Sequence, residues 1–147
     1  AAIIASALGM RACAFSMDAT DPVNDLTVAN VITAITNELM CPETPSGSLF
    51  NVNFPTISVS AINGAQGCAP ARSDLKMNLD LQSDGGYEIF SGLKVNIDDL
   101  ELTPGSDVEV LARGKVALTA LDGTSFDYLR DDQSLHRMID AANRVIG

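Results

Sequence analysis

The short, mostly apolar run at residues 10–17 constrains the fold more than any other segment. Gly9 precedes this run and Asp18 follows it, and a run of that length between such borders predicts a strand buried on both faces, as in a parallel sheet. Residues 1–8 are apolar with several small side chains, which predicts a buried helix that ends at Gly9. A helix followed by a buried strand is half of a βαβ unit, so we expect an α/β fold whose preceding strand lies upstream of residue 1.

The next segment repeats the order of helix and then strand. Asp21–Pro22 is a favourable helix start, because Asp can cap the helix and Pro at the first helical position loses no hydrogen bond. Apolar residues then keep a helical spacing as far as Leu39, and Pro42 helps to end the helix. Residues 48–55 alternate as a strand that stops at a proline. Residues 1–55 are therefore predicted to be the remainder of an α/β sheet domain.

The middle of the chain has the pattern of a β-hairpin. Residues 75–81 alternate strictly between apolar and polar, which predicts a half-exposed antiparallel strand. The Ser-Asp-Gly-Gly stretch at residues 83–86 suits a hairpin turn, residues 87–90 return along the first strand, and residues 93–97 alternate in the same way. We interpret residues 56–104 as a projecting β-arm.

The last part of the chain is predicted to close the sheet. Residues 108–111 are short and apolar, residues 115–121 form an expected strand, and apolar residues at helical spacing over 135–146 predict an amphipathic helix. Residues 105–147 are therefore expected to hold the final strand or strands and a C-terminal helix.

Composition excludes several classes of protein. The chain has 147 residues, of which 46% are hydrophobic, so a single domain with a sizeable core is expected. No apolar run approaches the roughly 20 residues that a membrane span needs. The formal net charge is −10 and only nine Lys and Arg are present, which argues against a bound nucleic-acid polymer. Cys13, Cys41 and Cys68 are odd in number and follow no metal-binding spacing, which predicts free thiols in a reducing cytoplasm.

The residues that could carry chemistry are few. His136 is the single histidine, so a His-rich metal site cannot be built, and a place on a helix surface or end is favoured for it. Two pairs of adjacent aspartates, Asp98–Asp99 and Asp131–Asp132, are expected to be solvated or to cap helices, because neither pair follows a buried strand. Four hydroxyl residues are expected to lack a nearby base: Thr20, Ser46, Ser48 and Thr124.

Three further segments are informative because of their order. Residues 1–16 read AAIIASALGMRACAFS, residues 49–55 read LFNVNFP and residues 105–119 read GSDVEVLARGKVALT. In the same order and spacing they resemble the AAxEGxxxGxxxxAxS, LxNVNxP and GTDxxAxxxGxVSxTPL segments of the SurE family, also called stationary-phase survival proteins. Residues 86–92 stand where that family has an aromatic segment. The resemblance covers nearly the whole chain.

The chain departs from the family pattern at three positions of the last signature. Lys115 and Ala117 stand where an aromatic residue and a serine are usual, and Ala120 replaces the usual proline. These differences concern packing or a subunit contact. Residues 59–64 superficially resemble the family's SGxN loop, but they follow the LxNVNxP segment instead of preceding it, and Ala61 replaces the glycine. A chance turn at Asn63–Gly64 is therefore predicted.

The resemblance implies the C-terminal half of a SurE-like Rossmann-type sheet with a projecting β-hairpin arm and a C-terminal helix. It also implies a divalent-metal phosphatase of the cytoplasm that hydrolyses nucleoside monophosphates to nucleoside and phosphate. The family holds Mg²⁺ or Mn²⁺ with an NDD motif, a serine in the following loop and the asparagine of an SGxN loop. All of these lie upstream of residue 1 in the family order, so no catalytic, cofactor-binding or metal residue is expected within residues 1–147, and this segment alone is expected to be inactive.

The resemblance further implies a homodimer, at times a tetramer, formed through the β-arm and the C-terminal helix. One alternative stays open at this stage. The chain could be a non-catalytic oligomerisation or interaction module derived from the same fold, since candidate catalytic residues are missing from it. A stand-alone binding protein with a new site would rest on the acidic charge alone.

Overall fold

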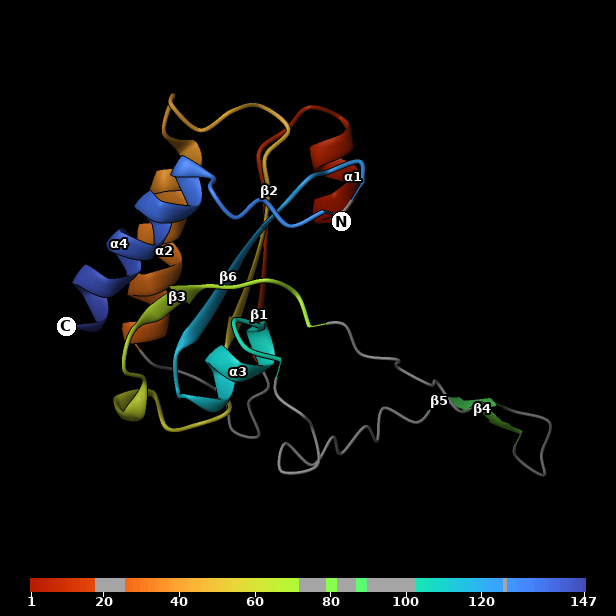
Figure 1. Ribbon diagram of the computed structural model, residues 1–147, viewed down its shortest axis with the longest axis vertical. Coiled ribbons are helices and arrows are strands. Elements are labelled where there is room, and N and C mark those ends of the chain that lie inside the picture. Colours follow the sequence, from red (N-terminus) through yellow and green to blue (C-terminus); the bar gives the residue numbers. More distant parts are fainter. Residues whose placement is uncertain (18–25, 72–78, 82–86, 90–102, 126) are drawn as a thin grey trace.

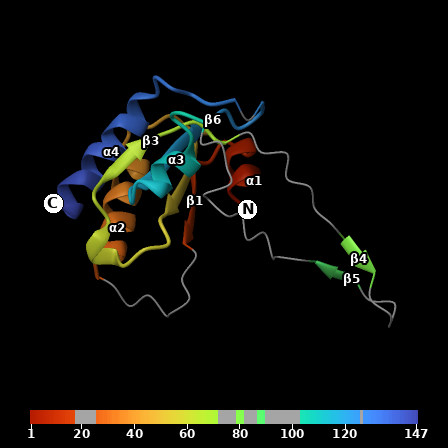
Figure 2. The same ribbon diagram turned by 60° about the horizontal axis from the view of Figure 1, so that its bottom comes forward.

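The computed structural model describes most of the chain as one α/β arrangement, at residues 1–17, 26–71, 79–81, 87–89, 103–125 and 127–147. A sheet of four strands lies between two layers of helices (Figure 1). Helices α2 (Leu26–Met40) and α4 (Gln133–Ile146) cover one face, and α1 (Ala2–Ala7) and α3 (Asp107–Ala112) lie on the other (Figure 2). The predicted α/β class is confirmed.

The sheet has the order β1-β2-β6-β3, with strands β1 (Ala12–Met17), β2 (Leu49–Phe54), β6 (Val116–Leu121) and β3 (Ala65–Gly67). Strands β1 and β2 are parallel and in register from the first residue of each strand to the last. Strand β6 runs antiparallel to β2, and β3 runs parallel to β6. The strands predicted at 48–55 and 115–121 therefore exist with nearly the predicted bounds.

The main hydrophobic core lies between the sheet and the α2/α4 layer. On α2, Val31 and Ile35 are fully buried, and on α4 Leu135 and Met138 are. They pack against alternate residues of the central strands, namely Phe50, Val52, Phe54, Val116, Leu118 and Ala120. The apolar face of the predicted amphipathic helix α4 thus packs within this chain. The predicted start of α2 at Asp21–Pro22 lies outside the described residues.

Residues 1–8 form a helix as predicted, but the prediction that this helix is buried is wrong. Helix α1 forms, but Ile4 and Leu8 are 67% and 72% exposed, and only Ser6 is buried. Strand β1 is correspondingly not buried on both faces: only Ala12 is fully buried, and Ser16 is exposed. The reason is positional, since β1 is an edge strand of the described sheet and pairs with β2 alone.

Three of the described elements were not predicted: α3, β3 and the short 3-10 helix η1 (Val59–Ala61). Residues 108–111 belong to helix α3, whose first turn is capped by Ser106: its side chain accepts a hydrogen bond from Glu109 N. Glu109 in turn accepts one from Gly105 N at 2.6 Å, so the Ser-Asp-Val-Glu sequence works much as a capping box does. Strand β3 has only three residues and lies within residues 56–104, which the sequence assigned to the β-arm, but it pairs with β6 of the main sheet.

The hairpin is confirmed where it is described. Strand β4 (Leu79–Leu81) pairs antiparallel with β5 (Tyr87–Ile89), with Leu79 opposite Ile89. In Figure 1 this ribbon lies apart from the sheet and its helices. The beginning of the first predicted strand, the turn at 83–86 and the alternating set at 93–97 lie outside the described residues. In the part of the chain that is described, no helix is both long and apolar enough to span a bilayer.

Candidate functional site

The carboxyl ends of β1 and β2 lie at one end of the sheet, which we call the β1–β2 edge. An α/β fold of this kind binds its ligands at such an end. The two strands end side by side, with Ser16 opposite Asn53 and Met17 opposite Phe54. Because β6 is antiparallel to β2, its first residues lie at the same edge. The parallel pair therefore builds the frame of a site, and the loop that follows β1 lies outside the described residues.

The loop at residues 59–64 is fastened to the start of β6 near this edge. Asn63 N donates to Gly114 O at 3.1 Å, and the Asn63 side chain donates to Arg113 O, also at 3.1 Å. Val116 N donates to Gly64 O at 2.9 Å, and Gly64 has a φ of 125°, a conformation that glycine adopts without strain. The Asn63 amide is thus engaged by backbone, and residues 62–64 form an irregular link into β3 and not the turn that was predicted at Asn63–Gly64.

The described side chains do not fit a metal ion. Among them, no group of three or more His, Cys, Asp or Glu is placed so that it could hold one. Asp131–Asp132 serves the backbone: Asp132 Oδ1 accepts from Leu135 N at 2.8 Å as the N-cap of α4, as the sequence indicated. Asp98–Asp99 lies outside the described residues.

The hydroxyl residues have structural hydrogen bonds. Ser48 Oγ donates to Pro45 O at 2.9 Å, Ser46 is exposed, and Thr20 lies outside the described residues. The expectation that Thr124 has no base nearby is wrong, since its hydroxyl donates to Asp122 Oδ1. Hydrogen bonds from Thr124 and Ser125 hold the pKa of the Asp122 carboxyl well below its usual range, however, and so weak a base does little to activate a hydroxyl.

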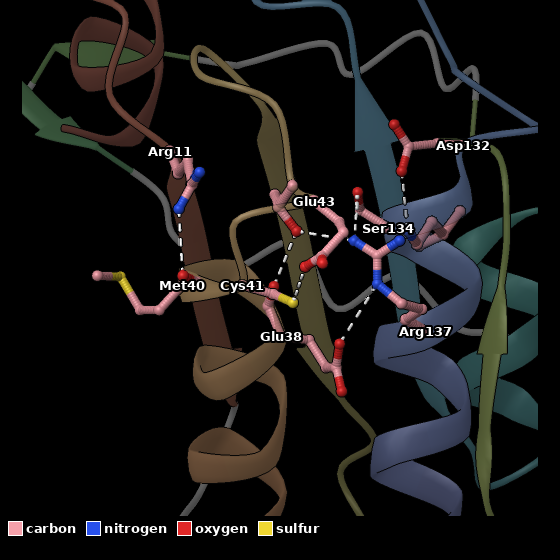
Figure 3. A network of polar contacts seen from close by, with 10 residues as sticks. Arg11, Glu38, Met40, Cys41, Glu43, Asp132, Ser134 and Arg137 are labelled. Carbon is pink, nitrogen blue, oxygen red and sulfur yellow. Dashed lines mark hydrogen bonds and ion pairs between the residues drawn. The ribbon is translucent and has the colours of Figure 1, made fainter.

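A network of polar contacts joins the end of α2 to α4 (Figure 3). Arg137 donates to Thr44 Oγ1 at 3.0 Å and to Ser134 Oγ at 3.1 Å, and its Nε lies 3.4 Å from Glu38 Oε2. At the other end of the network, Cys41 donates to Glu43 Oε2 at 2.6 Å. The contacts connect helix ends to one another, and we assign them to the stability of the α2/α4 layer.

The three cysteines are free, as predicted. Burial raises the pKa of the Cys13 thiol to about 12 and that of the Cys68 thiol to about 11. The hydrogen bond to the Glu43 carboxylate raises the pKa of the Cys41 thiol, although that side chain is open to solvent. A nucleophilic cysteine needs a lowered pKa, so these thiols do not have the setting of a catalytic residue.

The sequence did not indicate a hollow of about 380 Å³ beside β3 and α4. His136 lines it, exposed on α4 as the sequence favoured, together with Arg130 and Tyr128. Burial raises the pKa of the Tyr128 hydroxyl. The hollow depends on tertiary contacts between segments 60 residues apart, which is why no local motif predicts it.

The elements so far define a three-layer α/β protein in which the parallel strands β1 and β2 end side by side. The sequence model of the family described as Survival protein SurE matches residues 1–77, which is more than half of the chain. The chain therefore belongs to the SurE family.

Individual relatives agree with this assignment. The chain is 25% identical over 99 residues to the 5'-nucleotidase SurE of Sinorhizobium medicae, a match that covers 67% of this chain and 39% of the relative. It is 31% identical over 84 residues to the 5'-nucleotidase SurE of Azorhizobium caulinodans, covering 56% and 33%. The chain thus matches well under half the length of these curated relatives.

A solved structure shows the same fold. The crystal structure of the SurE protein from Aquifex aeolicus superposes with a TM-score of 0.54 at 21% sequence identity. The superposition covers 84% of this chain and 50% of that one. The predicted SurE-like Rossmann-type sheet is confirmed.

Proposed function

We propose that this chain is the later part of a SurE-type phosphatase that hydrolyses nucleoside monophosphates to nucleoside and phosphate. The observation that carries the proposal is the match of residues 1–77 to the SurE family, whose curated relatives are named 5'-nucleotidases. The parallel strands β1 and β2 support it, because they provide the edge at which such folds bind a substrate.

In this proposal the segment positions the site and does not carry the metal. The resemblance places the ligands of a Mg²⁺ or Mn²⁺ ion in loops upstream of residue 1. When bound, such an ion polarises a phosphoryl group and orients the attacking water. The described residues supply the frame: β2 lies in the middle of the sheet, and the core beneath it fixes the position of its carboxyl end.

The proposal includes assembly and location. We expect a homo-oligomer, a dimer or a tetramer, in the cytoplasm. The hairpin β4–β5 is the better supported contact, because a two-stranded ribbon is only marginally stable unless it packs against another surface. A contact through α4 would have to use its polar face, since its apolar face is buried against α2 and the sheet.

Phosphate release tests the proposal directly. The chain that begins at Ala1 and a longer chain that includes the upstream coding sequence would each be incubated with AMP and Mn²⁺ or Mg²⁺. We expect release by the longer chain alone. Release by the Ala1–Gly147 chain would contradict the upstream location of the metal ligands, and no release by the longer chain on any nucleoside monophosphate would contradict the nucleotidase.

One observation favours a second candidate, an interaction module without catalysis. Four large apolar side chains on and beside α1 are at least half exposed, namely Ile3, Ile4, Leu8 and Met10. A set of this kind marks a surface that a partner covers. The coding sequence distinguishes the two candidates: a start codon directly before Ala1 would support the module, whereas an upstream strand that ends in two adjacent aspartates would support the enzyme.

A further inference from the structure

The hollow beside β3 exists because two segments share one edge of β6. Strand β3 pairs with the first half of β6, with Gly67 opposite Leu118. Tyr128 forms a bridge with Leu121, and Leu129 N donates to Ala120 O at 2.9 Å, so a second segment takes over the same edge. The chain leaves the sheet between β3 and the segment at residues 128–129. The space between these two segments forms the hollow.

Helix α4 forms the opposite wall at close range. A Cβ placed on Gly67 would lie 3.0 Å from Ile139 Cδ1 and 3.5 Å from Leu135 Cδ2, so a larger residue there would push the Ile139 side chain away from β3. Leu135 and Ile139 line the hollow together with Pro104. One side of the space is therefore apolar, and its volume of about 380 Å³ lies in the range of small-molecule sites.

Arg130 is the one formally charged side chain among the described residues that line the hollow. Arg130 supplies a guanidinium, His136 an imidazole and Tyr128 a hydroxyl, and the described residues that line the space include no Asp or Glu. This is unusual for a chain with a net charge of −10. An Arg fork matches the geometry of phosphate and carboxylate oxygens, and it discriminates between anionic and neutral ligands.

None of the neighbouring acidic side chains lines the hollow, although Glu109 Oε2 accepts a hydrogen bond from the lining residue Gly105 N at 2.6 Å while Glu109 Oε1 pairs with Arg113. Asp132 caps α4 through Leu135 N, and Asp107 Oδ1 accepts from Ala71 N and Val108 N at 2.8 Å. Asp131 follows Arg130 in the exposed turn, and Asp140 is one helical turn beyond His136. Neither of these two lines the hollow.

We propose that this hollow binds a small organic oxyanion, a phosphate monoester or a carboxylate with a flat body. Its charged group lies at Arg130 and His136, and its flat part lies against Tyr128 and the apolar side of α4. The site opens along the side of β6 that faces away from β2. Strand β6 therefore lies between this site and the carboxyl ends of β1 and β2. It is therefore a second binding site, distinct from the one where hydrolysis is proposed.

Binding without metal tests this inference separately from the nucleotidase. Purified chain would be titrated with AMP, benzoate and inorganic phosphate by NMR or calorimetry, with chelator present. We expect saturable binding of AMP or benzoate, weakened about tenfold or more in R130Q and in H136Q because each loses a charge-assisted hydrogen bond. The stronger of the two organic ligands identifies the anion as phosphate or carboxylate.

A matched control separates a built site from bulk charge. R144Q removes the same charge from an exposed position on α4 that does not line the hollow, and it should bind as the unchanged chain does. Three results would overturn the proposal: no saturable binding of the organic anions, equal weakening in R144Q, or unchanged affinity in both R130Q and H136Q. Inorganic phosphate binding as tightly as AMP would overturn the role of the apolar wall. None of these results bears on phosphate release by a longer chain.

Discussion

On one face of the sheet, α2 and α4 bury Ile35 and Met138 completely, and the core there runs without interruption across the central strands. On the other face, α3 buries Val110 in a small cluster with Cys68 and Ala117, while α1 leaves most of its apolar side chains in solvent. The two faces of one sheet thus differ in how far this chain closes them. The difference teaches that, among the described residues, the α2/α4 layer carries most of the buried core, whereas the α1 side of the sheet is only thinly covered.

The largest expected effect is the loss of a core side chain from the α2/α4 face. Ile35→Ala should lower the free energy of unfolding by about 2–5 kcal/mol, because it leaves a cavity that the packed layer cannot refill. Ile4→Ala on α1 is the matched control and should change it by roughly 0.5 kcal/mol or less. Urea unfolding monitored by circular dichroism measures both, and equal losses would contradict the comparison.

The reactivity of Cys68 tests how well the small cluster under α3 is protected from solvent. Burial raises its pKa from 9.0 to about 11, so at pH 8 its thiolate population should be about a hundredfold below that of an ordinary cysteine. Alkylation by iodoacetamide should be correspondingly slow and should rise only as the pH approaches 11 or the chain unfolds.

The exposed thiol is the internal control for that measurement. Cys41 should react first, and Glu43→Gln should accelerate it, because the carboxylate hydrogen bond that raises its pKa is removed. Alkylation of Cys68 as fast as that of Cys41 in the folded chain would show that the cluster under α3 opens.

The small cluster should tolerate truncation better than the large core. Val110→Ala removes two methyl groups from a fully buried position and should cost about 2 kcal/mol of unfolding free energy. The midpoint of thermal or urea unfolding measures it against Ile35→Ala. A loss as large as that of Ile35→Ala would mean that the α3 face is as tightly packed as the α2/α4 face.

Loss of the N-cap of α3 should have the next smaller effect on the free energy of unfolding. Ser106→Ala removes the acceptor for Glu109 N and should cost about 1 kcal/mol, whereas Ser106→Thr keeps the acceptor and should cost less. Urea unfolding of the two variants provides the measurement. No difference between them would show that the hydrogen bond at 3.3 Å contributes nothing.

The smallest expected effect is the coupling between Arg137 and Glu38. The two side chains are both partly exposed and their closest atoms are 3.4 Å apart, so their coupling energy should be only about 0.5 kcal/mol. A double-mutant cycle with Arg137→Ala and Glu38→Ala measures it. Arg137→Ala alone should cost more, since it also removes the hydrogen bonds to Thr44 and Ser134. A coupling of several kcal/mol would make the ion pair the main tie of this layer.

Local sequence patterns determined the longer regular elements of this protein. The alternation at residues 49–54 predicts β2, the helical spacing predicts α2 and α4, and Asp132 caps its helix as aspartate does before a first turn. The capping signal at Ser106–Glu109 was also in the sequence and would have indicated α3. The order of three short segments was enough for the SurE resemblance, because motif order survives where overall identity falls.

Only the tertiary structure decided burial and the hollow. Residues 1–8 are apolar enough to be buried, but their exposure depends on what lies beside β1, and no property of the segment itself encodes that. Strand β3 forms because the edge of β6 is open to it and not because its three residues favour a strand. The hollow brings Gly67 together with Arg130 and His136, which lie much later in the chain. Periodicity reports the conformation of neighbours in sequence, whereas contacts between distant segments follow from how whole layers pack.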